Sequence, residues 1–83
     1  MKAKSKTSAV PVSMWDDTDK VGIRAKCEYL SDKHKFKVTV SREGKAYHEL
    51  FSAQYEPRFG MDVSDMNESM VIAERLAKKI EAG

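Results

Sequence analysis

Apolar residues recur at every second position from Val21 to Tyr29 and again from Phe36 to Val40, and at every third or fourth position between Met66 and Ile80. The first spacing is typical of strands with one buried face, and the second is typical of an amphipathic helix. A chain of 83 residues has room for a single domain. We therefore expect a two-layer α+β domain, in which a three-stranded antiparallel meander packs on one C-terminal amphipathic helix.

Two of the three predicted strands lie before the turn at residues 42–44. The inward-facing positions of the first strand are Val21, Ile23, Ala25, Cys27 and Tyr29. After a turn at Asp32 and Lys33, the inward-facing positions of the second strand are Phe36, Val38 and Val40. Charged or polar residues occupy most of the intervening positions, so one face of this sheet should be buried and the other solvated.

The residues Arg42, Glu43 and Gly44 form the turn of the hairpin, because glycine takes positive φ at low cost. A three-residue loop would place Val40 opposite Ala46. A two-residue loop would shift the register by one position and turn Tyr47 and Phe51 inward instead. The sequence leaves both registers open.

The helix follows an irregular segment that contains Pro57 and Gly60. Asp65 and Glu68 have the spacing of a capping box at its start. The apolar stripe expected to face the sheet consists of Met66, Met70, Ala73, Leu76, Ala77 and Ile80. Val71 and Ile72 lie off this stripe, and we interpret them as contacts to a second copy of the chain in a homodimer.

The N-terminal part offers little to bury. We interpret residues 1–13 as a flexible basic arm and residues 14–83 as the α+β domain. The stretch from Val10 to Val12 favours extended backbone at a sheet edge, since Pro11 lacks an N–H. Asp16, Asp17 and Asp19 are interpreted as a solvated acidic linker.

The charge is divided along the chain. Residues 20–45 carry eight basic and three acidic side chains, whereas residues 46–83 carry four basic and seven acidic ones. The predicted outer face of the sheet is basic through Arg24, Lys26, Lys35 and Lys37. Such a face, together with the lysine arm, makes nucleic-acid binding the alternative function.

The chemistry-bearing residues do not form a catalytic or metal-binding pattern. Cys27 is in phase with the buried positions of its strand, so it should be a small core residue rather than a nucleophile. His34 and His48 belong to no zinc-ligand spacing, and no phosphate-binding or nucleophile motif occurs. We expect no enzyme activity, no cofactor and no metal.

The sequence also constrains the cellular compartment of the protein. Since Cys27 is the only cysteine, the chain has no internal disulfide. No apolar run approaches the ~18 residues of a membrane span, and the first lysines are followed by Ser, Thr and Pro rather than by a secretory apolar stretch. We expect a cytoplasmic protein that does not interact with membranes.

Large side chains outside the periodic segments favour protein binding. Trp15 stands beside acidic residues, while Tyr55, Arg58 and Phe59 share one irregular loop. Trp, Tyr and Arg contribute much of the binding energy at interfaces. The competing interpretation is that Trp15 closes the end of a small core. We expect these four residues to bind a partner.

No family motif can be quoted from the chain. In size, charge division and absence of catalytic motifs it resembles the short inhibitors that bacteriophages encode, anti-CRISPR proteins among them. The resemblance implies a protein-binding module that docks on a partner protein or nucleoprotein complex and inhibits or modulates it.

Overall fold

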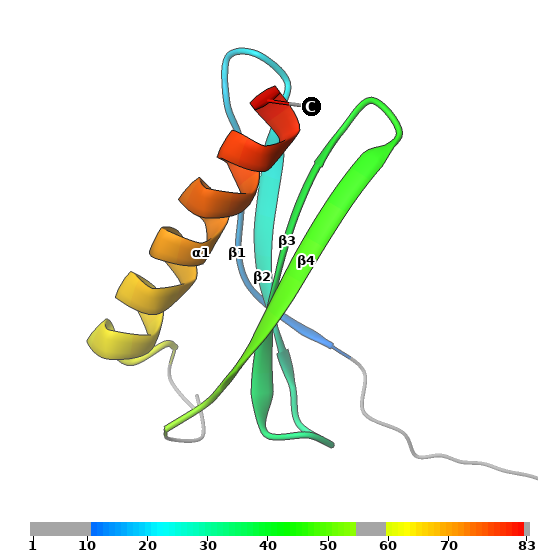
Figure 1. The fold of residues 1–83 in the computed structure, drawn as a ribbon. Helices are drawn as coiled ribbons and strands as arrows, with labels where there is room; N and C mark the ends of the chain where they lie inside the picture. The colour runs from blue at the N-terminus through cyan, green and yellow to red at the C-terminus, as the bar shows by residue number, and fades with distance from the viewer. Residues whose placement is uncertain (1–10, 55–59, 83) are drawn as a thin grey trace, which may run out of the picture.

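The computed structural model describes residues 11–54 and 60–82. Its strands, in chain order, are β1 (Val12–Thr18), β2 (Arg24–Leu30), β3 (Lys35–Arg42) and β4 (Lys45–Ser52). They form one antiparallel meander in the order β1-β2-β3-β4, and the helix α1 (Val63–Ala82) lies across one face of it (Figure 1). The predicted class, an α+β meander packed on one C-terminal helix, is confirmed, although the sheet has one strand more than expected.

The additional strand is β1, at the edge of the sheet. It contains Val12 and Ser13, which we had assigned to the arm, and two of the three acids that we had interpreted as a linker. Its register shifts between Ser13 and Trp15, so the alternation of inward and outward side chains breaks in mid-strand. The sequence of β1 therefore lacks the two-residue period by which a strand is predicted. The expected extended backbone at Val12 is confirmed, and residues 1–10 lie outside the described residues.

Residues 19–23 connect β1 to β2, and residues 20–22 form the tip of this turn. The N–H of Asp19 donates to the carbonyl of Ile23 at 3.0 Å, and Gly22 has a φ of +85°. This is the arrangement of a turn closed by a glycine bulge. Val21 therefore lies in the loop and is 56% exposed, which contradicts its predicted place as a buried strand residue.

The β3–β4 hairpin has the shorter of the two loops considered. Arg42 pairs with Lys45, and the two loop residues have φ values of +44° at Glu43 and +83° at Gly44. Both positive values fit the two-residue turn whose twist matches that of the strands. Tyr47 consequently pairs with Val40 and faces the side that carries α1.

The core lies between the centre of the sheet and the helix. Phe36, Val38 and Val40 of β3 are fully buried, and α1 packs chiefly on this strand. At one end of the core, Phe36 stacks on Phe51 with a distance of 5.2 Å between ring centroids. On the rim, Arg75 of α1 donates to Glu49 of β4 at 2.5 Å, which connects the helix to the far edge strand.

The helix starts earlier than predicted, and its buried face is shifted from the predicted stripe, of which Leu76 and Ile80 are buried as expected. Asp62 caps its start, since its Oδ2 accepts the N–H of Ser64 at 3.0 Å, so Asp65 is not the capping residue. The buried positions of the helix are Asp65, Ser69, Ile72, Leu76 and Ile80. Ile72 is therefore a core residue and its assignment to a dimer contact is wrong, whereas Val71 is exposed.

The hairpin turn gives a first prediction. Gly44→Ala should lower the free energy of unfolding by about 1 kcal/mol, because an L-residue is strained at this φ. Glu43→Asn should raise it by roughly 0.5 kcal/mol, because Asn tolerates the left-handed region. Urea denaturation measures both changes, and a neutral effect of Gly44→Ala would contradict this turn.

The corrected helix face gives a second prediction. Ile72→Ala should destabilise the domain by about 2 to 5 kcal/mol, because it leaves a cavity in the core. The neighbouring change Val71→Ala removes an exposed side chain and should alter stability by less than about 0.5 kcal/mol. Equal losses in thermal or urea denaturation would contradict this orientation of α1.

Candidate functional site

The sheet is wider than the helix that covers it. Neighbouring strands lie ~4.8 Å apart, so the outer strands of a four-stranded sheet are separated by about 14 Å, whereas a helix with its side chains is about 10 Å wide. In the described residues, the backbone of α1 comes close to those of β2, β3 and β4 but not to that of β1. The helix-side face of β1 is therefore left partly open.

A groove of about 340 Å³ occupies this opening between β1 and α1. Trp15 and Asp17 come from β1, while Ile23 and Ala25 belong to the start of β2 and the residue before it. The wall formed by α1 consists of Met66, Met70, Ala73, Glu74 and Ala77. Most of these side chains are apolar, and the volume is within the range of small ligand-binding clefts.

Trp15 is fixed in position by the helix. Its indole N–H donates to Oγ of Ser69 at 2.9 Å, and that hydroxyl donates to the carbonyl of Met66 at 2.7 Å. Ser69 is fully buried, while Trp15 is half-buried against the core. Trp15 thus packs against the core, as the competing interpretation held, and the same residue lines the groove.

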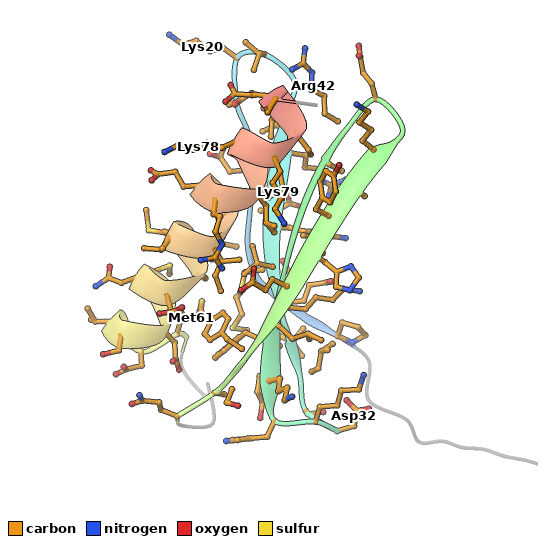
Figure 2. The ribbon with its side chains drawn as sticks, viewed as in Figure 1. Lys20, Asp32, Arg42, Met61, Lys78 and Lys79 are labelled. Carbon is orange, nitrogen blue, oxygen red and sulfur yellow. The ribbon has the colours of Figure 1, made fainter. Side chains whose placement is uncertain are left out.

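The groove has an apolar end and an acidic end. Trp15 and Met66 mark the apolar end, and the carboxylates of Asp17, Asp19 and Glu74 lie toward the β1–β2 loop. No cationic side chain is among the lining residues in the described part of the chain. Lys20, in that loop, projects away from the body of the molecule (Figure 2). The site thus combines an apolar surface with negative charge at one end.

Cys27 lies beneath this region and is fully buried, as expected from its place in the strand. Burial raises the pKa of its thiol from 9.0 to about 12, the bond with Ser69 opposes the rise, and the charges of Glu28 and Asp65 add to it. A thiol with such a pKa stays protonated at neutral pH and is a poor nucleophile.

The outer face of the sheet carries its cations beside anions. Arg24 makes two hydrogen bonds to Asp16, at 3.0 and 2.6 Å, which lower the pKa of Asp16 and raise the pKa of Arg24. In the register of β2 with β3, Lys37 stands opposite Glu28. The predicted basic face, with Lys26 and Lys35, is open to solvent, but its positive charge is partly neutralised.

The two histidines lie outside the residues that line the groove. His34 lies in the β2–β3 turn, with 2.9 Å between its Nδ1 and the hydroxyl of Tyr29, and His48 is exposed on the outer face. Within the described ranges, no three His, Cys, Asp or Glu side chains gather as a metal site would require. Tyr55, Arg58 and Phe59, predicted to bind a partner, lie outside the described residues.

Sequence analysis missed most of the groove. Met66 and Met70 had been placed in the core, but they belong to the helical wall because the helix is rotated toward Ile72, while Ala73 lines the groove and also packs against the core. The repeat of large aliphatic residues at positions 72, 76 and 80 was the available signal, since Ile and Leu at a four-residue spacing bury more apolar surface than Met and Ala. Asp17 gave no signal, because the bulge hides β1.

Comparison with protein-family models, with curated proteins and with solved structures gives no match. In residues 11–54 and 60–82, no helix has the length and apolarity needed to pass through a lipid bilayer.

The burial of Cys27 generates a third prediction. The pKa of the thiol is higher in the folded than in the unfolded chain. Its contribution to the free energy of unfolding is therefore complete below pH 9 and is lost as the pH rises toward 12. The free energy of unfolding should therefore fall more steeply between pH 9 and 11 in the natural chain than in Cys27→Ala. Parallel slopes in urea titrations would contradict it.

Proposed function

We propose that this chain is a non-enzymatic protein-binding module, which docks on a partner protein or nucleoprotein complex through the β1–α1 groove and thereby modulates it. The observation that carries the proposal is the open apolar groove beside Trp15. An exposed apolar concavity with polar groups at its rim is the usual form of an interaction site.

The residues of the groove suit a protein partner. Trp15 is a large ring held by one hydrogen bond, so it loses little further freedom on binding. Met66 and Met70 line the opposite wall, and Met70 is 58% exposed. Methionine side chains adapt to the shape of an apolar partner, so this wall can follow an inserted side chain.

The charges favour a protein over a nucleic acid. Phosphates require unpaired cations, but Arg24 on the outer face is bound to Asp16, and Lys37 faces Glu28. The groove itself carries carboxylates, which would repel a phosphate backbone. These contacts make nucleic-acid binding the weaker candidate.

Affinity capture with matched variants tests the proposal. The tagged chain is incubated with nuclease-treated lysate of its source cells, and bound proteins are identified by mass spectrometry. Met70→Lys should reduce capture of the partner at least about tenfold, because it places an ammonium group in the apolar part of the groove.

The matched control is Val71→Lys. Val71 is the next residue, is also 58% exposed and does not line the groove, so this variant should retain the partner. It also tests the remaining dimer prediction, since loss of a dimer in sizing measurements would identify Val71 as its contact. Equal capture by both variants would overturn the groove as the docking site.

A further inference from the structure

We infer that the groove takes an extended, basic segment of the partner, which pairs with β1 as a fifth strand and inserts apolar side chains beside Trp15. The inference rests on the proposed function and deepens it by naming the chemistry of the occupant. It follows from three features of the described residues: the free edge of β1, the direction of its side chains, and the charge of the groove.

Among residues 11–54 and 60–82, no strand pairs with the outer edge of β1, so backbone hydrogen-bonding groups are free there. The bond from the N–H of Asp19 to Ile23 fixes the ladder, in which hydrogen-bonded pairs alternate with unbonded pairs. Counting back along β1, the pairs of Thr18 and Asp16 with β2 are unbonded. The N–H and C=O groups of these two residues therefore point away from β2, toward the place where another strand would lie.

The side chains of β1 set the spacing that the occupant must have. Trp15 and Asp17 lie on the helix side of the strand, two residues apart, and both line the groove. A strand paired with β1 would place every second side chain on that same side, about 6.7 Å apart. Such a segment can insert one apolar side chain next to Trp15 and present another to Asp17.

The charge of the groove selects a cationic segment. Asp17 and Glu74 come from opposite walls, and a Lys or Arg side chain between them would meet two carboxylates. Asp19 adds negative charge at the same end, although its Oδ1 already accepts the N–H groups of Val21 and Ile23. The same acids disfavour a second copy, because pairing two β1 strands would bring like charges together.

A synthetic peptide tests the inference on the full chain. The probe is an acetylated and amidated peptide of seven residues, Lys-Thr-Ile-Thr-Ile-Thr-Lys, which reads the same in both directions and so fits either orientation on β1. Isothermal titration calorimetry should detect its binding. Replacing both lysines with glutamate should weaken binding at least about tenfold, since the peptide end at the acidic end of the groove then faces like charges in either orientation.

Two matched changes locate the interaction. Glu74→Lys should weaken binding of the lysine peptide at least about tenfold, whereas Glu81→Lys, an exposed position outside the groove, should change it less than about twofold. A peptide N-methylated at the residues that pair with β1 should lose binding, because it cannot donate to the strand.

Some results would overturn the inference. These are absence of peptide binding, equal binding of the glutamate peptide, and full binding of the N-methylated peptide. If the peptide fails while capture of the partner still depends on Met70, the basic strand is wrong and the groove remains the docking site. If the peptide binds as expected while capture is insensitive to Met70→Lys, the proposed function fails instead.

Discussion

A single helix has to cover the apolar face of a four-stranded sheet. Because it is narrower than the sheet, it can bury the inner strands fully and must leave an edge less protected. Here the helix packs chiefly on β3, where Phe36, Val38 and Val40 are completely buried. The hydrophobic gain at the centre thus determines where the open surface is found: on the helix side of β1, and at the exposed ring of Tyr47 on β4.

The helix contacts the two edges of the sheet in different ways. On the β4 side, Arg75 extends from the helix to Glu49, so charged groups occupy the margin of the core. On the β1 side, the indole of Trp15 reaches under the helix to Ser69 and leaves a concave apolar surface beyond it. The bond fixes the ring without burying it completely. A large, rigid and partly exposed aromatic side chain of this kind is well prepared for binding.

The central parts of the fold could be predicted from the sequence, because strong periodicity encodes them. The alternation around Val38 in β3 and the helical spacing around Leu76 predicted the two layers correctly. Local geometry decided the rest. The hairpin register depends on whether Glu43 accepts a positive φ, and β1 depends on a bulge that interrupts its period. Sequence patterns record neither of these choices.

The candidate site was harder to predict than the fold for the same reason. A groove is defined by what the helix fails to cover, and a rotation of the helix by one residue exchanges Met70 for Ser69 and Ala73 for Ile72 at the buried positions. Trp15 was predicted as a binding residue from its type and context, but its helical neighbours were not. The buried Ser69 that holds it has no distinctive sequence context, so only the structure reveals the pairing.

The most direct test of this account is a map of the bound surface by NMR. The ¹⁵N-labelled full chain is titrated with the lysine peptide, and the shifts of backbone amides and of the Trp15 indole N–H are followed. The account predicts that shifts concentrate in β1 and on the helix around Met70 and Glu74. Shifts concentrated on the outer face, around Lys37 and His48, would contradict it.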